Sequence, residues 1–325
     1  MIVDTQVHLC GHGWVTRGYL SGRGARTGAP PAGGGGGGGG AETAIMATYN
    51  RHHGTNLTPQ DFHEKVMRPY VDILDATGDN MMRWMDDAGL DKCVIFGVDW
   101  AYGVTGEPRV TNKEQNKIHA DAAKRHPDRL IALAALDPRR PDAIGQFIEC
   151  VEDWGMKGLK LHPGTGFRVD DPVCYPIVDL CSAYDLPIYI HTGMQPTSDP
   201  TSVARLAALY PQVKMVMGHA GAQQFPERAI GACMGHANVC MGVELHQRDF
   251  VYDPPGFYKW LRRIMDFCGP WKILFSSDSP DGDAMLPEKE WVDVFRNPKT
   301  DIKFAREEMD IVLGKAAQKV FGLQD

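Results

Sequence analysis

The sequence lacks a long apolar segment, an excess of basic residues and any Cys-x-x-Cys pair. No apolar stretch approaches the ~18 residues that span a bilayer, so we do not expect a membrane protein. The formal net charge is -7, which argues against nucleic-acid binding because such binders carry basic patches. The eight cysteines are scattered, several within apolar runs, so we expect reduced, buried thiols in a cytoplasmic protein. The N-terminus, Met1 to Asp4, is typical of a strand and lacks the features of a signal peptide.

The chain carries enough apolar residues for one large core. It has 325 residues and is 43% hydrophobic, which favours a single domain over residues 1–325, because α/β barrels often exceed about 250 residues. Short apolar runs alternate with helix-period segments, which predicts an α/β fold, most simply a (β/α)8 TIM barrel. An open doubly wound sheet is the alternative, but no Gly-x-Gly-x-x-Gly follows the first run. The eight runs cover residues 2–7, 91–98, 129–136, 155–162, 187–191, 213–219, 238–245 and 272–277.

One long insertion, residues 9–60, interrupts this alternation after the first run. It contains eight consecutive glycines, residues 33–40, whose backbone freedom opposes a packed structure. The glycines suit a natural low-complexity insertion and an engineered linker equally well. A long loop after a barrel strand lies over the active-site face. The insertion is therefore either a lid over the site or a disordered loop.

Four short segments place a histidine or an aspartate at or just after the end of an apolar run, namely His8, His191, His219 and Asp278. In a parallel barrel the strand ends deliver side chains to one mouth, where active sites lie. A polar ring or an ionised carboxylate at the exit of an apolar strand needs a partner or a metal ion. Four such residues on different strands therefore predict a mononuclear metal site.

Four short motifs surround these residues and occur in a characteristic order. Together they resemble the amidohydrolase superfamily, in particular the amidohydrolase-related branch that includes aminocarboxymuconate-semialdehyde decarboxylase. The resemblance implies a barrel with a divalent metal, zinc before manganese, held by His8, His191 and Asp278 with Gln6 as a further ligand. It also implies a possible homodimer. The motifs are GLKLHP at 158–163, IHTG at 190–193, GHAG at 218–221 and LFSSDSP at 274–280.

Gln6 is the point at which the chain departs from this resemblance. The family carries His-x-His on the first strand, or Glu-x-His in some decarboxylases, whereas this chain has Gln6-Val7-His8. A neutral amide oxygen is a weaker zinc ligand than an imidazole. Three outcomes remain open: Gln6 ligates weakly, His8, His191 and Asp278 hold the metal without it, or the site works without metal.

The resemblance also implies a reaction at this site. A bound metal lowers the pKa of a water molecule to about 7. Asp278 would act as general base and His219 would polarise a substrate carbonyl, with His191 as the third catalytic residue. We therefore expect a metal-dependent hydrolase that cleaves an amide, lactone or C–C bond of a small, anionic cyclic or aromatic-derived substrate. Three alternatives remain: a nonoxidative decarboxylase, a metal-free lactonase-type hydrolase and a barrel without turnover that serves as a binding protein.

Further residues near the strand ends are candidate substrate contacts. Lys160 and His162 share a strand face because they lie two residues apart. Glu244 lies in the seventh run and suits either a substrate contact or a partner of Lys160. The residues expected to bind substrate are Lys160, His162, Glu244, His246, Arg248 and Trp100.

Overall fold

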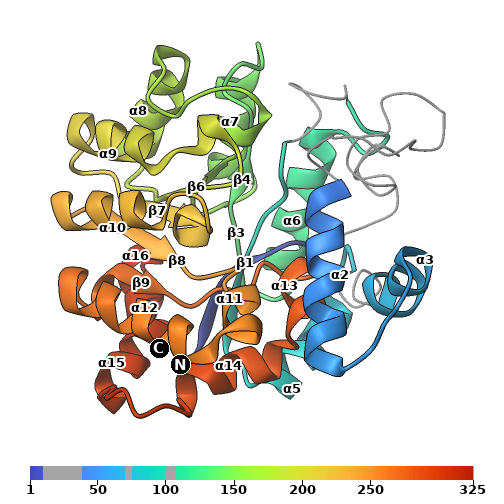
Figure 1. Ribbon diagram of the computed structural model, residues 1–325. Coiled ribbons are helices and arrows are strands. Elements are labelled where there is room, and N and C mark those ends of the chain that lie inside the picture. The colour runs from blue at the N-terminus through green and yellow to red at the C-terminus, as the bar shows by residue number, and fades with distance from the viewer. Residues whose placement is uncertain (10–38, 70–74, 100–106, 325) are drawn as a thin grey trace.

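The computed structural model describes residues 1–9, 39–69, 75–99 and 107–324, and its strands all pair in parallel (Figure 1). The third apolar run is divided in two, because Leu133 N donates to Ile95 O while Ala134 N donates to Gly158 O. The remaining runs each contain one strand. The strands are β1 (Val3–Val7), β2 (Lys92–Ile95), β3 (Leu130–Ala132), β4 (Ala134–Ala135), β5 (Leu159–Leu161), β6 (Ile188–His191), β7 (Met215–Gly218), β8 (Val239–Gly242) and β9 (Ile273–Leu274).

The strands follow one another around the sheet in chain order. β1, β2 and β3 form one sheet, and β4 to β9 form the other. Backbone hydrogen bonds then join the last strand to the first: Thr5 N donates to Phe275 O, Asp278 N to Gln6 O, and His8 N to Ser279 O, at 2.9–3.1 Å. This order agrees with the predicted (β/α)8 barrel.

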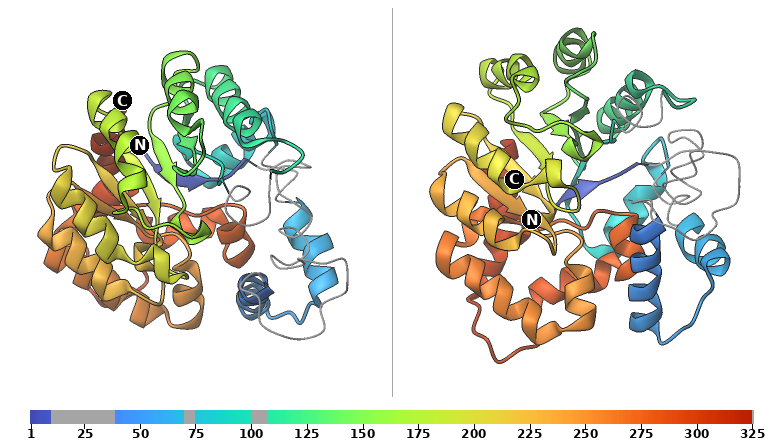
Figure 2. Two further views of the ribbon diagram at one scale, coloured as in Figure 1. Left: turned by 90° about the horizontal axis from the view of Figure 1, so that it is seen from above. Right: turned by 45° about the horizontal axis from the view of Figure 1, so that its top comes forward.

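Helices connect the strands and cover the outside of the barrel (Figures 1 and 2). Several begin at a side-chain cap, as where Asp199 accepts from Thr201 N and Asp253 accepts from Gly256 N, each followed by a proline in the first turn. The helices between strands are α5 (Asp79–Ala88), α6 (Asn112–Arg125), α7 (Ala143–Glu152), α8 (Tyr175–Ala183), α9 (Pro200–Leu209), α10 (Pro226–Gly235), α11 (Gln247–Tyr252) and α12 (Pro254–Cys268). The last strand is followed by α13 (Asp281–Met285), α14 (Glu288–Arg296), α15 (Arg306–Asp310) and α16 (Ala316–Phe321).

The barrel interior changes from apolar to polar along the strands. Alternate residues of one strand face the same side, so Leu274, Ser276 and Asp278 succeed one another inside the barrel, as do Tyr189 and His191. The apolar members, among them Leu274 and Tyr189, pack with α16 residues such as Ala317 in one cluster. The polar members follow toward the carboxyl ends of the strands, which is the end that carries the active site in this class of fold.

Part of the predicted insertion is helical. α2 (Gly39–His53) and α3 (Pro59–Phe62) lie at one side of the barrel (Figures 1 and 2), and α2 packs against α11 and α13. Ile45 and Phe62 are buried with Met285 of α13 in a small core of their own, which ties this part of the insertion to the segment that follows Asp278. Residues 10–38, which hold most of the glycine run, lie outside the described residues.

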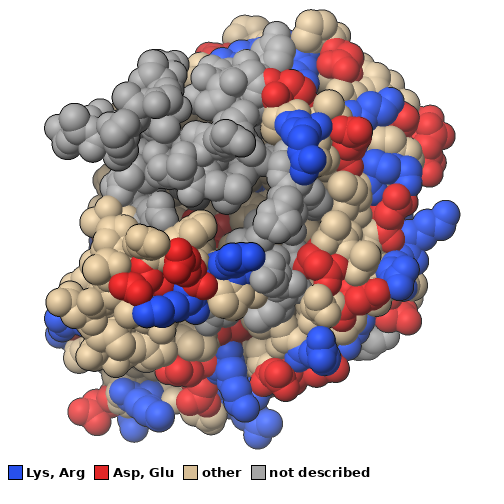
Figure 3. Space-filling model, turned by 90° about the vertical axis from the view of Figure 1, so that its right-hand side faces the viewer, with Lys and Arg blue, Asp and Glu red and all other residues tan. Residues whose placement is uncertain are grey.

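The surface and the cysteines agree with the composition. On the face drawn in Figure 3 the described basic and acidic side chains are interspersed, with no basic patch. None of the described helices combines the length and the apolar character needed to cross a membrane. Seven cysteines fall within the described residues, where they form no disulfide, and six of them are buried.

Candidate active site

Gln6, His8 and Asp278 converge where the first and last strands meet. His8 Nδ1 is hydrogen-bonded to Phe96 O at 2.8 Å, and His8 Nε2 lies 3.0 Å from Asp278 Oδ1. Gln6 Nε2 donates to the same carboxylate oxygen and lies 3.4 Å from His8 Nε2. The pairing of β1 with β2 shifts register between Asp4 and Val7, and such an irregularity re-aims side chains. The three residues thus share one point of the barrel mouth.

The charge of Asp278 is set by its surroundings. Burial alone would raise the pKa of this carboxyl, but the hydrogen bond with His8 and the positive charges that His219 and His8 carry when protonated outweigh it, so the pKa lies well below its usual range. Asp278 is therefore ionised at neutral pH. Its backbone has a left-handed φ of 63°, a conformation that costs energy for a non-glycine residue and often marks a functional position.

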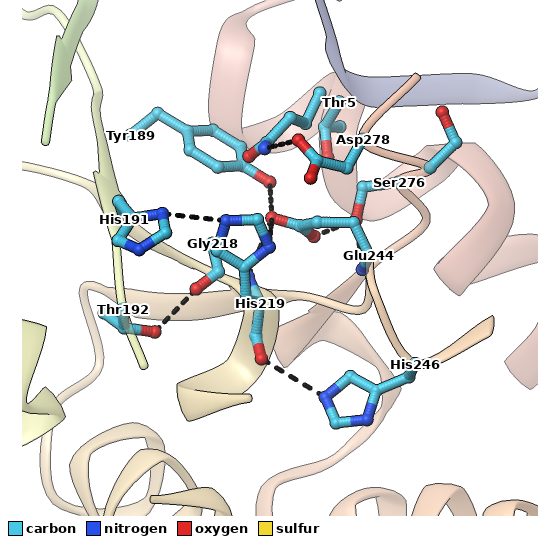
Figure 4. Close-up of polar contacts among 12 residues, drawn as sticks. Thr5, Tyr189, His191, Thr192, Gly218, His219, Glu244, His246, Ser276 and Asp278 are labelled. Carbon is cyan, nitrogen blue, oxygen red and sulfur yellow. Dashed lines mark hydrogen bonds and ion pairs between the residues drawn. The ribbon is translucent and has the colours of Figure 1, made fainter. Parts of the chain in front are cut away.

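The imidazoles of His162, His191 and His219 form a second group on neighbouring strands, and Figure 4 labels the last two. His219 Nε2 lies 2.9 Å from His191 Nδ1, and His191 Nε2 lies 3.2 Å from Gln195 Oε1. The rings of His162 and His191 are 4.0 Å apart between centroids. Burial, followed by the charges of His162 and His219, holds the pKa of His191 well below its usual value, and burial likewise lowers the pKa of His219. Both imidazoles are therefore neutral at neutral pH.

Lys160 supplies a buried positive charge between these two groups. Its Nζ lies 3.3 Å from Gln6 Oε1 and 4.6–4.7 Å from the ring centroids of Phe96 and Tyr189. Burial lowers the pKa of Lys160 to about 8, against the opposing charges of Glu244 and Asp278. The ammonium form therefore still predominates at neutral pH, within reach of the side chains at the barrel mouth.

Glu244 is fully buried beside His219 (Figure 4). Its Oε1 accepts hydrogen bonds from Tyr189 OH at 3.0 Å and from the backbone N–H of His219 at 2.7 Å, while Oε2 accepts from Ser276 Oγ. Sequence reasoning did not single out Tyr189 or Ser276. The sequence could have indicated both residues, because each lies two residues before a predicted site residue and so faces the same side of the strand.

The other predicted substrate contacts are placed differently. His246 stacks on Trp260 at 4.1 Å between ring centroids, and its nitrogens contact Asp249 Oδ2 and His219 O. Arg248 donates to Gln223 at an exposed position. Trp100 lies outside the described residues. The structure thus places Lys160, His162 and Glu244 close to His191 and His219. The side chains of His246 and Arg248 instead contact Asp249, Trp260 and Gln223.

The donors at His8 and Asp278 suit a divalent cation. The Nδ1 of His8 is engaged by a backbone carbonyl, which leaves Nε2 facing the carboxylate, and this arrangement is common for histidines that ligate metals. The Gln6 amide lies beside both atoms. Among the described residues, however, no group of three or more His, Cys, Asp or Glu side chains is arranged to hold a metal ion. His191, also predicted as a ligand, contacts His219 and Gln195.

Comparison with known proteins assigns the family. The profile of the Amidohydrolase family matches residues 68–323, and the chain belongs to this family. No curated protein has a matching sequence. The family and the barrel confirm the predicted membership of the amidohydrolase superfamily.

Solved structures are similar in fold at low sequence identity. An uncharacterised TIM-barrel protein from Bordetella bronchiseptica is 18% identical with a TM-score of 0.65, covering 99% of this chain and 98% of its own. The 5-carboxyvanillate decarboxylase of Sphingomonas paucimobilis is 15% identical with a TM-score of 0.63, covering 99% of both chains. A dihydroxybenzoic acid decarboxylase from Polaromonas, with bound manganese, is 16% identical with a TM-score of 0.64, covering 99% of this chain and 96% of its own.

A cluster of buried carboxyl groups lies behind the site. Asp4, Asp283 and Glu288 are buried, and Asp4 and Asp283 accept hydrogen bonds from Ser277 and Ser279, which flank Asp278. Burial raises the pKa of Asp4 to about 8 and of Asp283 to about 7, and raises the pKa of Glu288 well above its usual value. The folded protein therefore retains protons that the unfolded chain releases above about pH 4.

This cluster predicts a stability that falls as the pH rises. Between about pH 4 and 8 each retained proton lowers the free energy of unfolding by about 1.4 kcal/mol per pH unit. Glu288→Gln removes one such proton, so its free energy of unfolding should fall less steeply than that of the wild type. Urea unfolding at pH 6 and pH 8.5 measures the difference, and parallel pH profiles for the two proteins would show that Glu288 is ionised in the folded state.

Proposed function

We propose that this protein is a nonoxidative decarboxylase, a carboxy-lyase that acts on small hydroxylated aromatic acids with the help of a divalent metal. The observation that carries the proposal is a combination of three groups at the barrel mouth. An ionised Asp278 contacts His8, the neutral imidazoles of His219 and His191 contact each other, and Lys160 supplies a buried ammonium group. Two of the three solved structures named above are decarboxylases of aromatic acids. They favour the decarboxylase alternative of the sequence analysis over the hydrolase that we expected first.

The metal would be held by His8 Nε2 and Asp278 Oδ1, with the Gln6 amide beside them. Manganese accompanies the Polaromonas decarboxylase and a 5-carboxyvanillate decarboxylase from Novosphingobium aromaticivorans, which makes manganese the first metal to test and zinc the second. When bound, such a metal supplies positive charge that anchors a carboxylate or a neighbouring hydroxyl of the substrate. Whether His191 is a further ligand stays a prediction.

The protein's own side chains would bind the substrate and handle one proton. In the reaction, the bond between the ring carbon and the carboxylate breaks, its electron pair stays on the ring, carbon dioxide leaves, and the ring carbon takes up a proton. Asp278 and His219 are the groups placed to carry that proton. Lys160 offsets the negative charge of an aromatic carboxylate that would otherwise be costly to bury.

A substrate panel separates the decarboxylase from the hydrolase. We expect the manganese-loaded protein to release carbon dioxide from 2,6-dihydroxybenzoate, 5-carboxyvanillate or a related hydroxybenzoate, and to release no acid from aromatic lactones and amides. Treatment with a chelator should abolish the release, and added manganese should restore it. Acid release from the lactones or amides alone would reject the proposal, and full turnover after chelation would reject its metal.

A further inference from the structure

The turn that carries His219 has an unfavourable backbone conformation. His219, Ala220 and Ala222 have φ values of 66°, 44° and 47°, all in the left-handed region that non-glycine residues avoid. Such a conformation persists only where the surrounding structure holds it. The groups that hold this turn therefore decide where the His219 imidazole lies.

Glu244 is the group that contacts both the backbone and the ring of His219. Its Oε1 accepts the His219 backbone N–H at 2.7 Å and lies 3.6 Å from Nδ1 of the same residue (Figure 4). The carboxylate is itself held in place, because Tyr189 OH donates to Oε1 and Ser276 Oγ donates to Oε2. Donors surround it on each oxygen, as expected of an ionised carboxylate, which only accepts hydrogen bonds.

The carboxylate of Glu244 fits into space that exists because Gly218 and Gly242 have no side chain. A Cβ at Gly218 would lie 2.9 Å from Glu244 Oε1 and 2.8 Å from the Tyr189 ring. A Cβ at Gly242 would meet the other carboxylate oxygen and the Tyr189 hydroxyl. Neither Gly218 nor Gly242 has a positive φ. Close packing, and not backbone conformation, therefore requires glycine at these two positions.

We propose that Glu244 is a positioning residue for His219: it holds the strained turn through the backbone amide and favours the tautomer with the proton on Nδ1. This inference rests on the proposed function, in which His219 carries a proton to or from the substrate. Because the carboxylate can only accept, a proton on Nδ1 is favoured next to it, and Nε2 is left as the acceptor that faces the site and His191.

The preferred tautomer has a consequence for the neighbouring side chains. His219 Nε2 then accepts from His191 Nδ1–H across their 2.9 Å contact. His191 Nε2 is then an acceptor, whereas the structure places Gln195 Oε1 against it at 3.2 Å, so this tautomer requires the Gln195 amide to turn and present its NH2 group. This turn exchanges the oxygen and the NH2 group of the amide without changing its shape.

The test uses Glu244→Gln, which keeps the shape and an acceptor oxygen for the His219 N–H but removes the charge. NMR of labelled histidine nitrogens, with His219 assigned by its loss in His219→Asn, reports the tautomer directly. We expect Nδ1-protonated His219 in the wild type and a shift to the Nε2-protonated form in Glu244→Gln. Steady-state kinetics should show kcat lowered by about 10- to 100-fold with KM unchanged, as for other partners that orient a functional histidine.

Glu288→Gln is the control for the substitution itself, because it makes the same replacement at a buried, protonated carboxyl that does not contact His219. We expect it to leave the His219 tautomer and kcat as in the wild type. An Nε2-protonated His219 in the wild type, or an unchanged tautomer in Glu244→Gln, would overturn the inference. The NMR result does not depend on turnover, so a protein that decarboxylates nothing refutes the proposed function while the role of Glu244 is still decided.

Discussion

Asp278→Asn should lower kcat for decarboxylation by at least about a thousandfold, the upper part of the range for a positioned acid–base group. The substitution removes the ionised carboxylate beside His8. It also places an amide where Gln6 Nε2 and His8 Nε2 now face a carboxylate. The site would lose both its anionic metal ligand and a carrier of the proton.

Asp283→Asn is the matched control for this variant. It makes the same change in α13, at a buried carboxyl whose pKa is raised to about 7. A carboxyl that is largely protonated resembles an amide in charge, so kcat should change little at pH 6. Kinetics at pH 6 and the manganese content of each purified protein are the measurements. Equal losses of kcat in both variants would show that the effect is structural and that Asp278 has no special role.

His219→Asn should lower kcat by about 100- to 10,000-fold, the usual contribution of general acid–base catalysis. Asparagine retains the backbone N–H that Glu244 accepts, so the turn should persist while the imidazole is lost. KM should change less than kcat, because the ring acts on the proton and not on the binding of the carboxylate.

His126→Asn controls for the loss of an imidazole elsewhere. His126 lies at the end of α6, where it contacts Asp79 at the surface, and its replacement should leave kcat unaltered. Stopped assays of carbon dioxide release at saturating substrate compare the two variants. A His219→Asn protein that keeps wild-type kcat would exclude His219 from proton transfer and leave Asp278 as the only candidate.

The barrel could be predicted from the sequence because its signals are local. Each apolar run ends at a polar residue, and the period-two alternation carries the change from apolar to polar inside the barrel. The division of the third run into β3 and β4 could not be predicted in this way. It depends on Leu133 and Ala134 donating to carbonyls of different neighbouring strands, which is a property of the assembled sheet.

The strand-end positions of the candidate site residues were predictable, but the pairing of these residues was not. His8, His191, His219 and Asp278 all lie at strand ends as expected, yet the structure pairs His8 with Asp278 and His191 with His219. The role of Glu244 was left open, because it depends on the space left by Gly218 at the end of the neighbouring strand β7 and by Gly242 at the end of β8. Interactions between strands distant in sequence decide these points, and no local pattern records them.

The most direct test of the central claim is decarboxylation of the best hydroxybenzoate in D2O. The proposed reaction breaks a C–C bond and protonates the vacated ring carbon from a group that exchanges with solvent. NMR and mass spectrometry of the product should therefore show deuterium at that carbon alone, together with release of carbon dioxide. A product that gains a solvent oxygen without loss of carbon dioxide would contradict the account and identify the protein as a hydrolase.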